Sequence, residues 1–174
     1  MRPFLIFLCT ILVSCSNNEH EPFNVFLSSR NKYENIYKYS FGDDVISQVI
    51  EDTTTDDCLI VSVKDKSELR YFVTVANFLS DEICIDGWID KSSCAVYVRP
   101  RSETWEVYEY PSIIAPKIKF DSKEAEENIP LLYLLDYLKP KRYLKWVKVG
   151  FVYNGESYAG WTKDFCRDID HSCN

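Results

Sequence analysis

The sequence predicts an all-β protein built from two tandem small β-barrels. Three observations predict this: short stretches that alternate large or β-branched residues with polar ones, the hairpin signal Asn154-Gly155, and an internal repeat. The dipeptide Gly87-Trp88 returns as Gly160-Trp161, once in each repeat. The predicted units are residues 23–93 and 94–174.

The repeat emerges when residues 58–75 are aligned without gaps on residues 132–149, at an offset of 74. This alignment matches Phe72 with Trp146 and Val75 with Val149. A shorter match pairs residues 24–29 with residues 106–112. Because the matched segments occur in the same order at similar spacing, we expect two homologous units.

Each unit is expected to contain five short strands, which favour a small barrel over an open sheet. The alternation in 72–75 and 146–149 is typical of half-buried strands, and the polar stretches 64–69 and 139–144 are turns between strands. The long polar stretches 31–57 and 117–128 are expected to be excursions between the first and second strands. Within the latter, residues 122–128 can form one helical turn, which Pro130 stops.

Small barrels have little core, so aromatic side chains are expected to fill it. Phe72, Trp88, Trp146 and Trp161 are the candidates. The glycine before Trp88 and before Trp161 is expected to let a strand bend at a barrel corner.

The first fifteen residues have the features of a secretory signal. Arg2 precedes a ten-residue apolar run, 4–13, which is too short to span a bilayer because about 20 residues are needed. The run ends in Leu12-Val13-Ser14-Cys15, which resembles the lipobox of bacterial lipoproteins. The resemblance implies a signal peptide 1–14, diacylglycerol on Cys15 and a tether 15–22, anchoring the protein by lipid to a bacterial membrane in the cell envelope. The alternative is an ordinary signal peptide cut nearby.

The charge balance argues against nucleic acid as a partner. The chain has 20 Lys and Arg against 27 Asp and Glu, a formal net charge of −7, which becomes −8 once the segment with Arg2 is removed. A negative domain repels nucleic acid at long range. No other stretch of 18 apolar residues exists, so the lipid anchor is the one membrane contact that the sequence predicts.

The C-terminal tail contains Cys166, His171 and Cys173. Outside the cytoplasm the two cysteines can form a disulfide that closes a short loop and restrains the end of the chain. A zinc site that includes His171 is the rival interpretation, but structural zinc takes four ligands and the tail supplies three at most. Free thiols are a third alternative.

Three further cysteines lie upstream, at Cys58, Cys84 and Cys94. A disulfide between Cys84 and Cys94 would flank Gly87-Trp88, and a pair between Cys58 and either of them stays open. Because the number is odd, we expect one thiol to remain free and buried.

The second unit resembles bacterial Src-homology-3-like domains. The resemblance is carried by Val107-Tyr108-Glu109-Tyr110-Pro111, by Trp146-Val147-Lys148-Val149 and by Gly160-Trp161. In that family an opening strand with a V-Y-x-x-P turn leads to a long loop, a strand ending in W-x-K-V, and a hairpin ending in G-W.

The first unit matches the family pattern more loosely. Val25-Phe26 lacks the proline, Phe72 replaces the tryptophan, and Gly87-Trp88-Ile89 is retained. The spacing of Cys166 and Cys173 after Gly-Trp is similar to that in lipoproteins of the Bacteroidetes type built on this fold. The resemblance covers residues 24–173 and implies two tandem Src-homology-3-like barrels.

The sequence contains no constellation that indicates catalysis. A cysteine nucleophile needs a base, and His171 is the one candidate in the predicted folded part. Paired carboxylates such as Asp43-Asp44 and Asp56-Asp57 are usually solvated, and no Asp-x-Asp-x-Asp-Gly loop suggests calcium. We therefore expect a non-enzymatic protein without a metal or cofactor.

Binding is the remaining class of function. In domains of the resembled family, aromatic residues of the long loop line a groove for extended peptides or peptidoglycan stems. Tyr37, Tyr39, Tyr108 and Tyr110 are the corresponding candidates here. The structural alternative is that about half of these tyrosines only close small cores.

Two hypotheses about function follow. The first is an envelope lipoprotein that binds a peptide, peptidoglycan or a protein partner through its Src-homology-3-like domains. The second is a structural or immunity-type lipoprotein that holds one specific protein through its acidic surface, without a groove.

Overall fold

The computed structural model describes residues 23–28, 32–51, 59–77, 84–97, 99, 102–129, 131–138 and 146–165. Its elements are β1 Phe23–Leu27, β2 Tyr33–Tyr37, β3 Val45–Ile50, β4 Leu59–Lys66, β5 Arg70–Asn77, β6 Cys84–Asp90, the 3-10 turn η1 Lys91–Ser93, β7 Cys94–Val96, β8 Thr104–Tyr108, β9 Lys117–Asp121, α1 Ser122–Asn128, β10 Leu132–Tyr137, β11 Val147–Tyr153 and β12 Glu156–Thr162.

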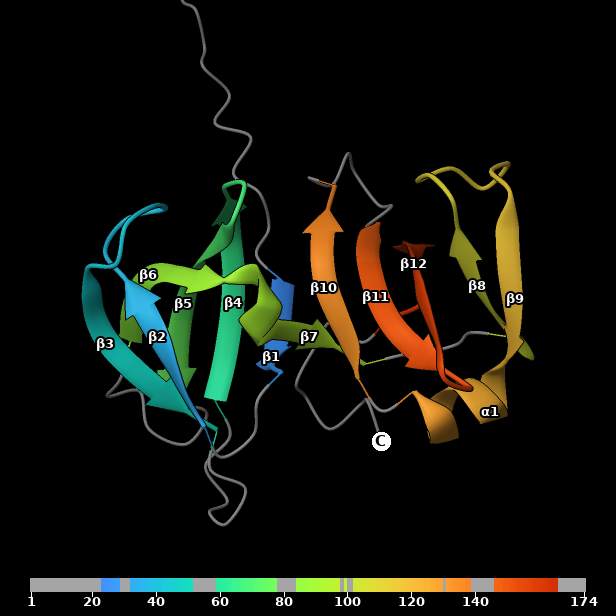
Figure 1. Ribbon diagram of the computed structural model, residues 1–174, viewed down its shortest axis with the longest axis horizontal. Helices are drawn as coiled ribbons and strands as arrows, with labels where there is room; N and C mark the ends of the chain where they lie inside the picture. The colour runs from blue at the N-terminus through green and yellow to red at the C-terminus, as the bar shows by residue number, and fades with distance from the viewer. Residues whose placement is uncertain are drawn as a thin grey trace, which may run out of the picture.

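The strands form one antiparallel sheet in the order β3-β2-β6-β5-β4-β1-β7-β10-β11-β12-β8-β9. The all-β fold class is therefore confirmed. The sheet is not closed: β3 lies at its left-hand edge and β9 at its right-hand edge (Figure 1). The predicted boundary between residues 93 and 94 falls between η1 and β7.

The same strand pairing occurs twice. β1 to β6 and β7 to β12 take the same neighbours in mirror order, and β1 and β7 join the two halves as antiparallel partners. Tyr37 pairs with Trp88 where β2 meets β6, and Tyr108 pairs with Trp161 where β8 meets β12. In β4 and β10 the register shifts at corresponding places (Val63/Asp65 and Leu134/Asp136).

The expected register of the repeat is wrong by two to three residues. Val63 pairs with Val73 and Leu134 pairs with Val149, so the offset is 71 in the first strand of this hairpin (63 to 134) and 76 in the second (73 to 149). The second unit has five additional residues in this hairpin. A single offset without gaps, 74, therefore falls between the two true offsets. Trp146 therefore corresponds to Arg70 rather than to Phe72.

Two expectations about the start of each unit are also wrong. Residues 31–57 and 117–128 contain β2, β3, β9 and α1, so they are not loop excursions. The pairing of β8 with β12 makes β2 its counterpart, so Ile36-Tyr37, and not Val25-Phe26, corresponds to Val107-Tyr108. Among the residues described, each unit has six strands instead of five.

The larger hydrophobic core runs through both units. Alternation along β5 and β11 turns one face inward, where Val73, Val75 and Val149 are completely buried. Trp105 of β8 is also completely buried, and its Nε1 donates to Thr162 Oγ1 at 3.1 Å. Sequence analysis did not single out Trp105 for the core.

The aromatic residues that were expected in the core are less buried than Trp105. Trp146 is buried, whereas Phe72, Trp88 and Trp161 are half-buried. Phe72 and Trp88 contact each other with ring centroids 5.3 Å apart. Phe72 lies between the buried Tyr71 and Val73 of β5, and Trp88 follows the same alternation in β6, so both rings lie on the face of the sheet opposite the core.

Polar contacts also join the two units. The Tyr71 hydroxyl donates to the Leu134 carbonyl at 3.3 Å. Lys66 Nζ donates to Asp136 Oδ1 and to the Tyr137 carbonyl, both at 2.6 Å. The second unit thus packs directly against the first.

Two predicted local features are confirmed. Asn154 and Gly155 have φ angles of 51° and 81° and join β11 to β12 in the hairpin that the sequence predicts. Residues 122–128 form α1, whose N-cap Asp121 accepts bonds from the backbone N–H groups of Lys123 and Glu124.

Cys84 and Cys94 are both free thiols, so the suggested pair between them is not formed. Cys84 is exposed, and Cys94 is buried as expected of one thiol. Cys15, Cys58, Cys166 and Cys173 lie outside the described residues, as do the expected signal peptide, the tether and His171. Within the described ranges, no helix has the length and apolar character needed to cross a membrane.

Candidate functional site

The repeated Gly-Trp dipeptide marks the place where one strand passes closely over another. A Cβ on Gly87 would lie 2.3 Å from Ile36 Cγ2, and a Cβ on Gly160 would lie 2.4 Å from Val107 Cγ1. The carbonyl oxygens of Tyr37 and Tyr108 would lie 3.1 and 2.9 Å from the same two positions. Glycine is therefore needed for close backbone approach in both units, and the expected strand bend stays a prediction.

This crossing leads into a turn in each unit. We name residues 38–44, between β2 and β3, the first tip, and residues 109–116, between β8 and β9, the second tip. Equivalent backbone bonds close them: Lys38 N donates to the Asp44 carbonyl at 2.8 Å, and Glu109 N donates to the Pro116 carbonyl at 2.9 Å. Both tips lie at the upper end of the molecule in Figure 1.

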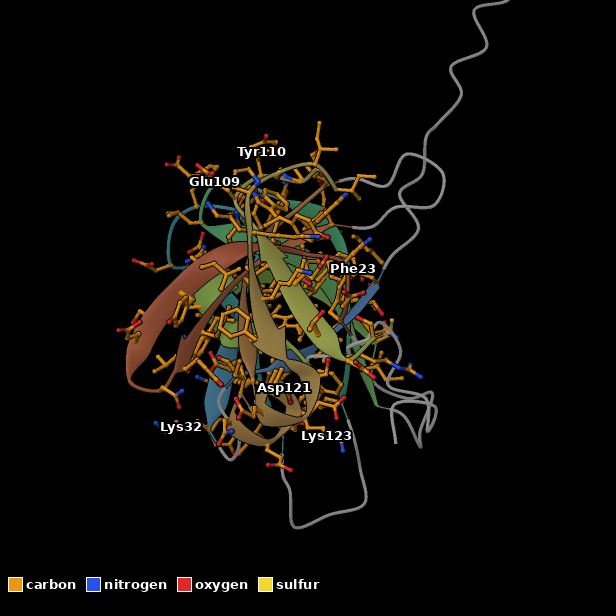
Figure 2. All side chains as sticks on the ribbon, turned by 90° about the vertical axis from the view of Figure 1, so that its right-hand side faces the viewer. Phe23, Lys32, Glu109, Tyr110, Asp121 and Lys123 are labelled. Atoms are coloured by element: carbon orange, nitrogen blue, oxygen red, sulfur yellow. The ribbon has the colours of Figure 1, made fainter. Side chains whose placement is uncertain are left out.

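The four candidate tyrosines form two equivalent pairs at these tips. Tyr37 and Tyr108 end the strands that lead into the tips, and Tyr37 is half-buried while Tyr108 is 2% exposed. Tyr39 and Tyr110 lie on the tips and are 44% and 48% exposed. Figure 2 shows Tyr110 and Glu109 at the end of the molecule opposite Lys32 and Lys123.

Arg70 holds the first tip. Its guanidinium lies 3.4 Å from the ring centroid of Tyr37, and its Nε donates to Asp90 at 2.8 Å. Its NH1 also donates to the carbonyls of Tyr39 at 3.1 Å and Gly42 at 2.7 Å. Arg70 is only 7% exposed, so its charged hydrogen bonds to the two carbonyls hold the tip in this conformation.

Trp146 takes the place of Arg70 in the second unit. Its ring meets Tyr108 edge-on, with centroids 5.1 Å apart. Tyr108, Ala115 and Trp146 form a small separate cluster against which Trp161 packs. The second tip is thus held by apolar contact, whereas the first is held by charge and hydrogen bonds.

A cavity of about 320 Å³ opens beside the second tip. Its lining is mostly apolar and comes from β8, β9, β12 and the end of the second tip. The lining residues are Val107, Tyr108, Glu109, Pro116, Lys117, Ile118 and Ala159.

In the first unit an additional side chain lies at the strand crossing. Tyr37 pairs with Val45 and Ile36 with Ser47, so Ile46 is an additional residue in a β-bulge. Its Cδ1 lies 3.2 Å from the position of a Cβ on Gly87. β8 and β9 pair without a bulge, and no side chain of β9 is among the atoms nearest Gly160.

Charged groups beside the cavity are paired. Glu106 accepts hydrogen bonds from Lys117 Nζ at 2.8 Å and from the Tyr108 hydroxyl, and Lys119 lies 3.4 Å away. The bond from Lys117, followed by that from Tyr108, lowers the pKa of Glu106 from 4.5 to about 2. Burial, together with the bond to Glu106, raises the pKa of Tyr108. This network holds Tyr108 and Lys117 in place at the cavity.

An apolar recess with a lysine and a glutamate at its rim suits an apolar side chain of a polypeptide. Sequence analysis found Tyr108 but missed Pro116, Ile118 and Ala159, because their meeting depends on the crossing of β8 over β12. The similarity of Ile36-Tyr37-Lys38-Tyr39 to Val107-Tyr108-Glu109-Tyr110 is the signal that could have identified both tips.

No group of three His, Cys, Asp or Glu side chains suited to a metal ion occurs among the described residues. Comparison with protein-family models gives no match for this chain. Comparison with curated proteins gives no match either.

Proposed function

We propose that this protein is a non-enzymatic bacterial envelope lipoprotein that binds an extended peptide through the cavity beside its second tip. The peptide belongs to a partner protein or to a peptidoglycan stem. The cavity itself carries this proposal, because it offers a mostly apolar recess beside the second tip with Lys117 and Glu109 at its rim.

We also propose that both units are opened relatives of the Src-homology-3-like fold. The twofold occurrence of the strand crossing at Gly87-Trp88 and Gly160-Trp161 supports this relation. So does the 3-10 turn between the last strand of the first unit and β7. In this reading the peptide-binding cavity belongs to the second unit.

Filling the cavity tests the binding proposal. Ala159 is exposed and lines the cavity, so Ala159→Phe adds a ring there without enlarging the core. Val152→Phe adds the same ring at an exposed site on β11, outside the cavity lining, and serves as the matched control. Retention on purified peptidoglycan sacculi, measured by sedimentation, should fall at least tenfold with Ala159→Phe and stay within twofold with Val152→Phe. Tyr110→Ala should weaken retention by an intermediate factor.

Failure to bind sacculi in every variant, with salt-sensitive capture of one basic protein that Ala159→Phe leaves unchanged, would favour the structural or immunity-type function instead. The exposed carboxylates Asp43 and Asp44 on the first tip are the observation that favours this second candidate.

The membrane anchor is tested separately. Intact-mass analysis of protein extracted from the envelope should find diacylglycerol on Cys15 and a chain that begins there. Cys15→Ser should leave the full leader attached or release the protein from the membrane fraction.

A further inference from the structure

Among the described strands, none lies beside the outer edge of β3. β3 is the last strand on its side of the sheet, and within the described part of the chain it pairs only with β2. Its six residues, VISQVI, carry no charge. Val45 is 45% exposed and Ile46 is 49% exposed. Such an edge presents unpaired backbone N–H and C=O groups beside apolar side chains, which is the template for an additional strand.

The equivalent edge of the second unit is protected against such pairing. β9 carries Lys117 and Lys119, and the side chain of Lys119 is 58% exposed. Charged residues, lysine above all, are the usual means by which proteins block an edge strand. The two units share one plan, so the uncharged edge of β3 is a feature of the first unit alone.

The first tip places negative charge beside this strand edge. Asp43 and Asp44 directly precede β3 and are exposed. On the same tip Tyr39 and Phe41 stack with centroids 6.2 Å apart; Lys38 Nζ lies 5.2 Å from the centroid of Tyr39, whereas Phe41 is 74% exposed. Carboxylates and aromatic faces both attract the cationic groups of Lys and Arg. Arg70 fixes the carbonyls of this tip, so little order is lost when a partner binds.

We propose that the outer edge of β3 takes up an extended segment of another protein as a thirteenth strand. The segment carries β-branched or apolar residues opposite β3 and Lys or Arg at the end that lies beside Asp43 and Asp44. This surface lies at the opposite edge of the sheet from the cavity of the second unit, and the proposal stands independently of that cavity (Figure 1).

A second copy of this chain is a poorer occupant. In an antiparallel pairing of β3 with itself, centred between Ser47 and Gln48, Asp44 of one copy would lie opposite Glu51 of the other. Like charges directly opposite each other destabilise a strand pair. A basic segment meets no such repulsion.

The test uses two synthetic nine-residue peptides of alternating Val and Thr, one ending in two lysines and the other in two glutamates. Binding to the folded chain is measured by ¹⁵N amide shifts and by fluorescence anisotropy at low salt. The lysine peptide should bind at least tenfold more tightly than the glutamate peptide, with the largest shifts in residues 43–50. The double variant Asp43→Asn/Asp44→Asn should remove most of this difference.

Two matched variants test whether the peptide binds at β3. Val45→Lys gives β3 a lysine like those that protect β9, and it should weaken binding of the lysine peptide at least tenfold. Val152→Lys adds the same charge on exposed β11 and should change binding by no more than twofold. Equal affinity for the two peptides, shifts confined to the second unit, or concentration-dependent self-association that Val45→Lys abolishes would each overturn the proposal.

Discussion

At the residue scale, one position in each unit decides how its tip is held. Arg70 and Trp146 are structural counterparts, and each covers the tyrosine that ends the strand before the tip. Arg70 also satisfies two backbone carbonyls, which Trp146 cannot do. The same backbone plan is thus stabilised by a buried cation in one unit and by aromatic contact in the other.

Replacement of Arg70 by Met should destabilise the protein by about 2 kcal/mol, because hydrogen bonds to a charged group are lost and two tip carbonyls lose their partner. Arg70→Lys should rescue little of this loss, since lysine lacks the planar fork that reaches Asp90 and Gly42 together. Urea unfolding of both variants measures the effect. Wild-type stability in Arg70→Met would mean that the contacts of Arg70 do not hold the tip.

Glu106 should make the stability of the folded protein depend on pH in the acidic range. Its pKa is about 2 in the folded protein and 4.5 ordinarily, so the folded state binds the proton more weakly. Its contribution is therefore complete above about pH 5 and disappears as the pH falls toward 2. The difference in melting temperature between wild type and Glu106→Gln should shrink over this range. A constant difference from pH 6 to pH 2 would contradict the assignment.

The two described thiols should differ strongly in reactivity. Burial raises the pKa of the Cys94 thiol, whereas Cys84 is exposed. Iodoacetamide labelling of the native protein, followed by peptide mass analysis, should modify Cys84 at least a hundredfold faster than Cys94. Denaturation should equalise the two rates, and equal rates in the native protein would show that Cys94 is accessible.

At the scale of elements, short motifs in the sequence predicted a turn and a helix correctly. The positions of some strands and of the loops between them were not predicted correctly. Asn154-Gly155 forms its hairpin because both residues tolerate positive φ, and Asp121 caps α1 because its carboxylate reaches two free N–H groups. β3 escaped prediction because Val49 is the one buried residue among its six, so it lacks the alternation that reveals a half-buried strand. The cavity escaped because its lining comes from β8, β9 and β12, and no local pattern reveals that these strands meet.

The β11–β12 hairpin provides a test at this scale. Gly155→Ala places a Cβ at φ 81° and should cost about 1 kcal/mol in urea unfolding. Asn154→Gly keeps positive φ accessible and should change stability by no more than about 0.5 kcal/mol. Similar losses in the two variants would indicate that the turn conformation is not what Gly155 provides.

At the scale of the whole molecule, the protein is one plan used twice in a single sheet. The order of the strands, the tyrosine–tryptophan pairs and the register shifts beside Asp65 and Asp136 all recur. The two copies differ at the surfaces for which we propose partners: the first has Ile46 at its strand crossing and an uncharged outer edge, whereas the second has the cavity and a lysine-bearing edge. Sequence comparison of the halves found the repeat but not its register, because five residues are added within one hairpin.

The most direct test of the repeated plan is the unfolding free energy of three glycine-to-alanine variants. Gly87→Ala and Gly160→Ala should each lose about 2 kcal/mol or more, because the new Cβ would meet Ile36 or Val107 and a backbone carbonyl. Gly150→Ala should lose less than about 1 kcal/mol, since its Cβ would meet only the movable, 41% exposed side chain of Leu135 at 3.3 Å. If either Gly87→Ala or Gly160→Ala proved as mild as Gly150→Ala, the two strand crossings would not be equivalent and the account of a duplicated plan would be contradicted.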